Sequence, residues 1–227
     1  MQGKERPFEL YVFDWDGTCM DTTPFIAEAI KEACRALGLP VPSDELAKSV
    51  IGLGYADCMS RIAPGCPASE LPRFNEAYWQ AYIRQEEFLT SLHPGMRELL
   101  SAMKRSGLWM AIATGKSRRG ISRILGKTDA AGFFVASRTA DESTPKPAPD
   151  MLLELSDECC VPLERMVMVG DAVHDLRMAE NAGVASVGVT WGAAKREELL
   201  GFKPRAVVDT VPELARALGV ADLCPGA

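Results

Sequence analysis

The sequence predicts a doubly wound α/β fold with an all-helical segment inserted after the first strand. Short apolar runs alternate with segments of helical periodicity along most of the chain, as in parallel strands that are connected by helices. The apolar runs seldom alternate with polar residues, which is typical of strands that are buried on both faces. Between about residues 22 and 92 no convincing strand occurs. A chain of 227 residues can form one large core and a smaller companion domain.

Six strands and five connecting helices are expected in the core. The predicted strands are Glu9–Phe13, Trp109–Ala113, Phe133–Ala136, Met166–Val169, Ala185–Val189 and Ala206–Val208. The predicted helices are Met96–Ser106, Gly120–Leu125, Pro149–Cys159, Leu176–Ala182 and Val211–Leu218. Because open α/β sheets bind ligands beyond the carboxyl ends of their strands, polar residues that follow these runs are the candidates for a functional site.

The inserted segment carries four helical patterns that are interrupted by glycine and proline: Phe25–Leu37, Ser43–Ser49, Tyr55–Ile62 and Ser69–Leu89. We therefore predict a core domain formed by 1–21 and 93–227 and a helical domain formed by 22–92. Gly52-Leu53-Gly54-Tyr55 is a candidate for the loop of the helical domain that faces the site, although a simple turn between helices explains it equally well.

Composition favours a reduced, cytoplasmic protein. The formal net charge of −6 argues against nucleic acid or an anionic membrane as the partner. The seven cysteines include no Cys-x-x-Cys pair, which speaks against a zinc site and a secreted disulfide framework. The first residues contain no apolar signal-peptide core, and no stretch is long enough to span a bilayer. The oligomeric state stays open.

Two carboxylates follow the first predicted strand, in Val12-Phe13-Asp14-Trp15-Asp16-Gly17-Thr18. Each would cost several kcal/mol to bury unpaired, so Asp14 and Asp16 suit a position beside a cation or a reacting phosphate. One carboxylate could attack phosphorus while the other carries a proton or helps to hold a metal. Taken alone, the segment also fits an ordinary acidic turn.

Three further segments place polar groups after predicted strands or in a stiff loop. Thr114-Gly115-Lys116 offers a hydroxyl and backbone N–H groups at a strand-to-helix turn, which can hold an anion but also fits a capped helix start. Lys116, Arg118, Arg119 and Arg123 form a basic cluster that we interpret mainly as a solvated helix face, with one member near the phosphate.

Lys146 lies in a proline-rich loop that would hold its ammonium in place, unless it is a solvated surface lysine. Gly170-Asp171 follows the fourth predicted strand, with Asp175 four residues on. Carboxylates in such positions suit magnesium, which needs few protein oxygens because it keeps several waters. A turn before a helix N-terminus explains these acids as well.

In this order, the four segments resemble the motifs of the haloacid dehalogenase-like (HAD) phosphohydrolases, and most of all the phosphoglycolate-phosphatase-like branch. The resemblance covers nearly the whole chain and implies a Rossmann-like core, a helical cap over 22–92 and an aspartyl-phosphate mechanism. Asp14 would be the nucleophile, Asp16 the general acid and base, and Lys146 the counter-charge. Thr114, Gly115 and Lys146 would hold the phosphate. Mg²⁺ would bind Asp14, the backbone carbonyl of Asp16, and Asp171, with Asp175 in support.

The expected function is a magnesium-dependent phosphomonoester hydrolase that acts on a small phosphorylated metabolite, such as phosphoglycolate or a sugar or nucleotide phosphate. The closest alternative is a phosphosugar mutase of the β-phosphoglucomutase type, for which Arg61 is an isolated candidate to grip a second phosphate. A dehalogenase is disfavoured because that branch lacks the acid that stands here as Asp16. A non-catalytic protein on the same scaffold is disfavoured because the acids and the lysine are all present.

Overall fold

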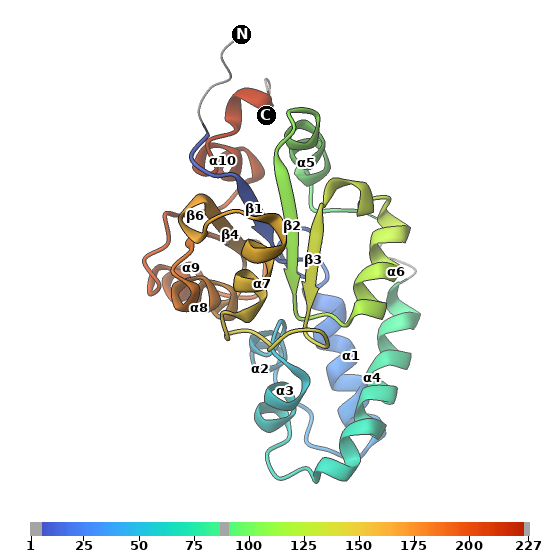
Figure 1. Cartoon of the computed structure of the whole chain (residues 1–227). Coiled ribbons are helices and arrows are strands. Elements are labelled where there is room, and N and C mark those ends of the chain that lie inside the picture. The colour runs from blue at the N-terminus through green and yellow to red at the C-terminus, as the bar shows by residue number, and fades with distance from the viewer. Residues whose placement is uncertain (1–5, 87–90, 225–227) are drawn as a thin grey trace.

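A computed structural model describes residues 6–86 and 91–224 of the chain. Its sheet has six parallel strands in the order β3-β2-β1-β4-β5-β6 (Figure 1). The strands are β1 (Leu10–Phe13), β2 (Trp109–Thr114), β3 (Ala136–Thr139), β4 (Met166–Gly170), β5 (Ala185–Val189) and β6 (Ala206–Val208). This topology confirms the predicted doubly wound α/β fold. The strand order reverses at β1, between β2 and β4, which is where such sheets bind ligands.

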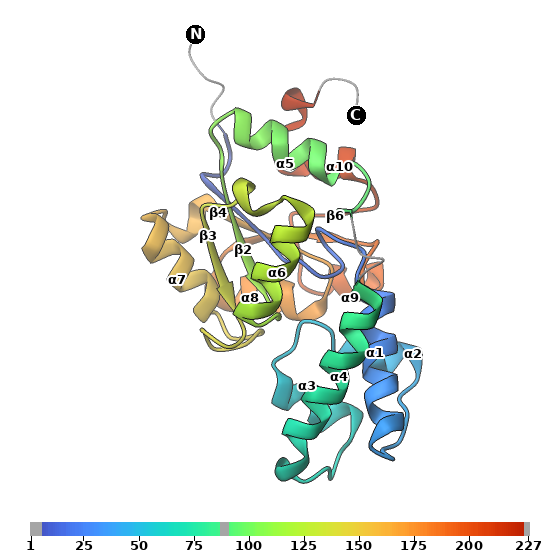
Figure 2. The ribbon, with the colours of Figure 1, turned by 90° about the vertical axis from the view of Figure 1, so that its right-hand side faces the viewer.

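Helices cover both faces of the sheet (Figure 2). Leu10 and Val12 of β1 pack with α7 (Asp150–Cys159) and α8 (Val173–Ala182). Tyr11 and Phe13 belong to the core on the other face. That core includes α5 (Met96–Arg105), α6 (Arg118–Thr128) and α10 (Val211–Ala217). Burial on both faces explains why the β1 sequence is continuously apolar.

The predicted strand Phe133–Ala136 is wrong in position. Residues Ala131–Phe133 form a short 3₁₀ turn, and β3 begins only at Ala136. The ring of Phe134 packs edge to face with Phe13 at 6.5 Å and with Trp15 at 6.2 Å between centroids. The apolar residues thus serve core packing, while the more polar Ala136–Thr139 segment pairs with β2 at the edge of the sheet. The short helix α9 (Arg196–Leu200) was not predicted.

Four helices lie between β1 and α5: α1 (Thr23–Ala36), α2 (Asp44–Ser49), α3 (Tyr55–Ile62) and α4 (Leu71–Glu86). They gather at the carboxyl ends of the strands, with α1 packed along α4 (Figures 1 and 2). A 3₁₀ turn, Ala68–Glu70, precedes α4, and the predicted helix end at Leu89 lies outside the described residues. The division into two domains stays a prediction.

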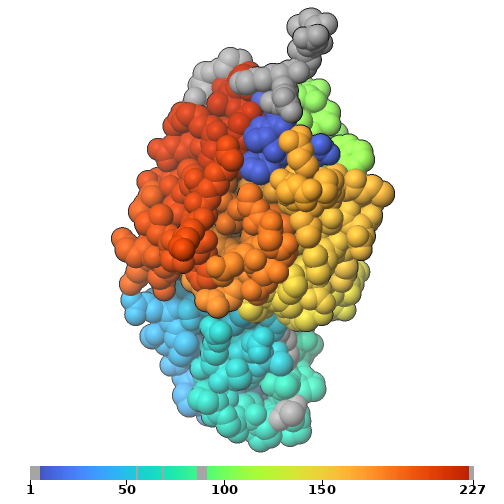
Figure 3. Space-filling model, turned by 60° about the vertical axis from the view of Figure 1, so that its left-hand side comes forward, coloured from blue at the N-terminus to red at the C-terminus, as the bar shows by residue number. Residues whose placement is uncertain are grey.

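The helical segment lies directly against the C-terminal half of the chain in the space-filling view (Figure 3). One contact between them is a hydrogen bond of 3.0 Å, in which His174 Nε2 at the start of α8 donates to the carbonyl of Ser49 at the end of α2. Among the described residues, none of the helices is long and apolar enough to cross a membrane.

Candidate active site

Asp14 and Asp16 lie in a tight loop at the carboxyl end of β1. The N–H of Asp14 donates to the carbonyl of Val169 on β4 at 2.9 Å, so strand pairing fixes the backbone from which this side chain extends. Gly17 adopts a φ of +83°, and a Cβ there would lie 2.2 Å from a carboxylate oxygen of Asp171. Glycine therefore lets the loop turn and also lets it approach the acid that follows β4.

Lys146 joins the carboxylates of Asp14 and Asp175. Its Nζ lies 2.6 Å from Oδ1 of each, and all three side chains are buried. Burial opposes the charge of Lys146, but the two carboxylates outweigh it, so the pKa of Lys146 is raised. Burial also raises the pKa of Asp14 well above its usual range, although Lys146 opposes this effect. The lysine is thus in position to offset charge at Asp14.

Asp171 is held by donors from two directions. The hydroxyl of Thr18 donates to Oδ1 at 2.6 Å, and the N–H of Ala193 donates to Oδ2 at 2.7 Å. Burial, with the neighbouring charge of Asp175, raises the pKa of Asp171 to about 7 despite these hydrogen bonds. Thr18, which was predicted only as part of a turn, therefore helps to orient Asp171.

The carboxylates of Asp14, Asp171 and Asp175 form one buried group, with an oxygen of each within 4.8 Å of the others. Such an all-oxygen donor set fits a hard divalent cation, because burial and, to a smaller extent, the neighbouring carboxylates raise the pKa of Asp14 and Asp171, and a cation would favour their charged forms. Asp175 already accepts from Lys146 and from the N–H of Ala172 at 3.0 Å, which suits its predicted supporting position. The residues present therefore fit the predicted magnesium ion.

The carboxylate of Asp16 belongs to a different cluster. Its Oδ1 accepts a hydrogen bond of 2.6 Å from the hydroxyl of Thr22 and lies 3.0 Å from Nζ of Lys116. Lys116 also lies 3.1 Å from the hydroxyl of Tyr82 on α4. The predicted metal contact of Asp16 was through its backbone carbonyl, so the side chain stays available for proton transfer. Thr22 and Tyr82 were not predicted.

Thr114 and Gly115 lie where the chain leaves β2. Thr114 is fully buried, and its hydroxyl accepts from the N–H of Lys116 at 3.2 Å. A Cβ at Gly115 would lie 2.7 Å from the carbonyl oxygen of Gly52, in the loop between α2 and α3. The absence of a side chain at Gly115 thus lets this loop approach the end of β2, and the candidate loop at Gly52 does face the site.

A cavity of about 460 Å³ lies between the helical segment and the ends of the strands. We call it the interface cavity. Asp16, Gly115 and Lys116 line it on the strand side, whereas Asp14, Lys146, Asp171 and Asp175 lie outside its lining. The helical side contributes mostly apolar and aromatic side chains, including Ile26, Ile30, Phe74, Tyr78, Trp79 and Tyr82. The predicted residues therefore form a buried charged cluster and a second group that faces an open space.

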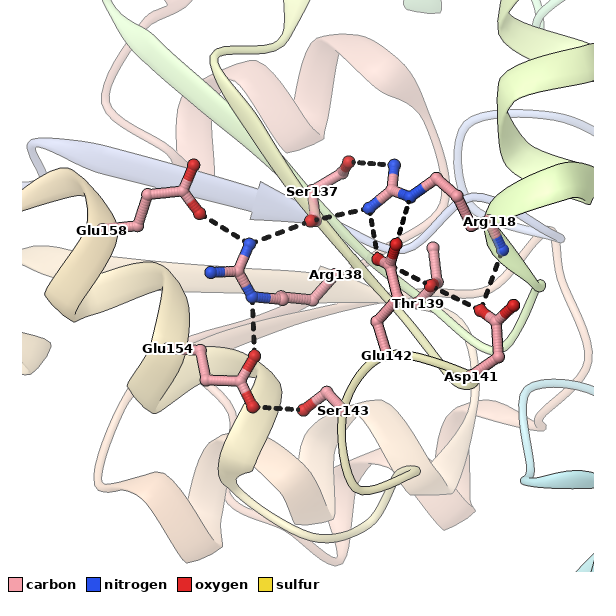
Figure 4. Close-up of polar contacts among 9 residues, drawn as sticks. All are labelled: Arg118, Ser137, Arg138, Thr139, Asp141, Glu142, Ser143, Glu154 and Glu158. Carbon is pink, nitrogen blue, oxygen red and sulfur yellow. Dashed lines mark hydrogen bonds and ion pairs between the residues drawn. The ribbon is translucent and has the colours of Figure 1, made fainter.

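The predicted basic cluster separates in the structure. Lys116 reaches Asp16, whereas Arg118 turns away and binds both carboxylate oxygens of Glu142, at 2.8 and 2.6 Å (Figure 4). Arg119 and Arg123 on α6 lie over the ring of Trp79, with guanidinium carbons 5.3 and 5.9 Å from its centroid. One member is thus beside Asp16 and the others make surface or partly buried contacts, while the expected position of one member near the phosphate stays a prediction.

Comparison with known proteins shows the family of the chain. Residues 11–189 match the family model described as haloacid dehalogenase-like hydrolase. The chain is 30% identical over 224 residues to the phosphoglycolate phosphatase of Vibrio parahaemolyticus, covering 95% of this chain and 98% of that protein. It is 31% identical over 212 residues to a Dickeya dadantii protein named "Probable phosphatase IndB", covering 92% of each.

A crystal structure of a predicted phosphoglycolate phosphatase from Haemophilus somnus superposes with a TM-score of 0.83 at 25% identity, covering 92% of this chain and 97% of that one. The names of these relatives confirm the predicted enzyme class, a phosphatase, and the predicted branch. From the family match over most of its length, the chain belongs to the haloacid dehalogenase-like hydrolases.

Proposed function

We propose that the chain is a magnesium-dependent phosphomonoester hydrolase that acts on a small phosphorylated metabolite through an aspartyl-phosphate intermediate. The observation that carries this proposal is the buried bridge from Lys146 to Asp14 and Asp175, beside Asp171. This bridge lies at the carboxyl ends of β1 and β4, where the strand order reverses. A fixed carboxylate with a fixed cation beside it is what an attack on phosphorus requires.

Asp14 would attack phosphorus through Oδ2, because Lys146 binds its Oδ1. Lys146 would offset the charge that gathers as nucleophile and phosphate approach each other. Thr114 and the backbone at Gly115 would hold phosphate oxygens. A magnesium ion held by Asp14, Asp171 and the carbonyl of Asp16, with Asp175 in support, would neutralise charge on the phosphate.

Asp16 would protonate the leaving alcohol and then take a proton from the water that cleaves the aspartyl-phosphate. Its Oδ1 is held by Thr22 and Lys116, which leaves Oδ2 for this proton. Both contacts fix the direction of the carboxylate toward the interface cavity, in which the leaving group would lie. The helices of 22–92 would form the cap domain that covers this cavity and excludes water.

The test is release of inorganic phosphate from a panel of small phosphomonoesters, measured with magnesium, with calcium alone and with excess chelator. We expect turnover with magnesium only, because calcium favours a higher coordination number than this small donor set supplies. Folding of each sample is checked by circular dichroism. Full activity in chelator or in calcium alone would contradict the metal assignment, and no phosphate release from any ester would contradict the hydrolase.

The mutase alternative is decided by the same samples. A mutase would convert a sugar 1-phosphate into the 6-phosphate with little free phosphate, whereas the hydrolase releases phosphate at the rate at which the ester disappears. Arg61, the candidate for gripping a second phosphate, is exposed and lies outside the lining of the interface cavity, which favours the hydrolase.

A further inference from the structure

The interface cavity has a wall that is more apolar than a small charged metabolite needs. The α4 helix presents stacked aromatic rings, with Tyr82 6.1 Å from Tyr78 and 6.2 Å from Trp79 between centroids, both at interplanar angles of 23°. Ile26 and Ile30 of α1 line the cavity beside this wall. A volume of about 460 Å³ lies within the range of cavities that bind drug-sized ligands. A two-carbon leaving group such as glycolate would leave most of it unfilled.

The charges in the lining do not favour an anionic leaving group. Among the described residues, the charged ones that line the cavity are Asp16, Asp141 and Lys116. Lys116 is held in place by Asp16 at 3.0 Å and by the hydroxyl of Tyr82 at 3.1 Å. A carboxylate on the leaving group would meet the charge of Asp141. The one cation that the described residues contribute to this lining is Lys116, which is already directed at Asp16 and Tyr82, so burying the carboxylate there is unfavourable.

Other cations near the cavity are also engaged. Arg119 and Arg123 lie over the ring of Trp79 and do not belong to the lining. Arg118 directs its guanidinium to Glu142 and Ser137, while its backbone N–H donates to Asp141 at 2.8 Å (Figure 4). The hydroxyl of Thr139 donates to the same Asp141 oxygen at 2.7 Å. Asp141 is thus held by hydrogen bonds, while the nearby Arg118 guanidinium, which binds Glu142, also attracts its charge.

We infer that the interface cavity takes a neutral, apolar leaving group, so that the substrates are phosphomonoesters of aromatic or branched alkyl alcohols and not of carboxylated alcohols such as glycolate. This inference rests on the proposed hydrolase and specifies its substrate class. The ester oxygen would lie beside Asp16 and the apolar body against the aromatic face of α4. Burial of apolar surface and ring stacking would then supply the binding free energy.

The test compares benzyl phosphate with 4-carboxybenzyl phosphate and with 2-phosphoglycolate, in magnesium. The two benzyl esters have similar leaving groups and differ chiefly in one remote carboxylate. We expect kcat/KM for benzyl phosphate to exceed that for each carboxylated ester at least about tenfold, equivalent to about 1.4 kcal/mol. Equal or better turnover of the carboxylated esters would overturn the inference and leave the hydrolase intact, whereas no turnover of any ester would contradict the hydrolase itself.

A measurement of binding tests the apolar leaving-group cavity independently of the proposed hydrolase activity. Calorimetric dissociation constants for the two benzyl esters with folded Asp14→Asn do not depend on turnover. A Kd for benzyl phosphate at least about tenfold lower, again about 1.4 kcal/mol, supports the apolar cavity. Equal Kd values overturn it, whether or not the wild-type protein is active.

A matched pair of variants tests the charge argument. Asn75 on α4 lines the cavity and is exposed, so Asn75→Arg adds a cation at the cavity without replacing a buried residue. We expect it to shift the kcat/KM ratio at least about threefold toward 4-carboxybenzyl phosphate. Gln80→Arg adds the same charge at an exposed position of α4 outside the lining and should leave the ratio unchanged. Equal ratios for both variants would contradict the charge argument.

Discussion

Replacement of Lys146 by methionine is expected to lower the free energy of unfolding by about 3–5 kcal/mol near neutral pH. Methionine retains an unbranched apolar stem, so loss of the ammonium dominates. The Lys146 side chain is fully buried, and its Nζ lies 2.6 Å from oxygens of both Asp14 and Asp175. Each charge-assisted hydrogen bond contributes about 1.5–3 kcal/mol, and the two carboxylates would be left buried without their cation.

The assay is urea unfolding followed by circular dichroism in excess chelator, so that no divalent cation replaces the missing charge. Lys31→Met is the control, because Lys31 Nζ also lies 2.7 Å from two acids, Glu28 and Asp44. Those acids are 38% and 74% exposed, so this loss is expected to cost about 1 kcal/mol or less. If Lys146→Met cost no more than Lys31→Met, the reasoning about the buried bridge would be refuted.

Asp16→Ala is expected to form the phosphoenzyme from an aryl phosphate but to hydrolyse it slowly, since the base that activates water is lost; breakdown at the wild-type rate in rapid-quench experiments would exclude this role. A phosphoserine protein should show a kcat/KM at least about tenfold below that of small esters, about 1.4 kcal/mol, because the helices cover the cavity; equal values would contradict that arrangement. Burial lowers the pKa of His93 in the folded chain. As the pH falls below about 6.5, the unfolded chain therefore binds a proton at His93 more readily than the folded chain does, and the free energy of unfolding decreases. His93→Phe keeps a ring on Trp191, which His93 stacks against at 4.7 Å, and should remove the His93 contribution to the slope of unfolding free energy against pH between about pH 5 and 8, while the contributions of His174 and Asp171 stay; a slope equal to that of the wild type would refute the assignment.

Strands buried on both faces could be predicted from continuous apolar runs, and so could the partly buried edge strand Ala206–Val208, because all of its residues are apolar. Leu10–Phe13 and Met166–Gly170 are continuously apolar because helices pack on either side of them. The edge strand Ala136–Thr139 could not be predicted in the same way, because it is only partly buried and carries polar residues. The strand was predicted too early in the chain because Phe134 is apolar, but Phe134 packs its ring against Phe13 and Trp15 in the core.

The candidate site also contains residues that could be named from the sequence and contacts that could not. Asp14, Lys146 and Asp171 could be named as candidates because the four segments resemble, in order, the motifs of the haloacid dehalogenase-like phosphohydrolases; the structure brings them together, and their roles stay predictions. The contacts of Thr22 and Lys116 with Asp16, and of Lys116 with Tyr82, could not be predicted. Thr22 and Asp16 are six residues apart after β1, and Asp16 and Lys116 follow the paired strands β1 and β2. The contact between Lys116 and Tyr82 joins the end of β2 to α4, and only the approach of the helical segment to the sheet brings those two side chains together.

The central claim is that Asp14 is the nucleophile, and the most direct test is to find the residue that carries the phosphoryl group. Asp16→Ala protein is mixed with an aryl phosphate and magnesium, quenched in acid and reduced with borohydride, which converts an acyl phosphate into an alcohol. Peptide mass spectrometry is predicted to find homoserine at position 14 and unchanged aspartate at 171 and 175. Homoserine at either of those positions, with Asp14 unchanged, would contradict the account.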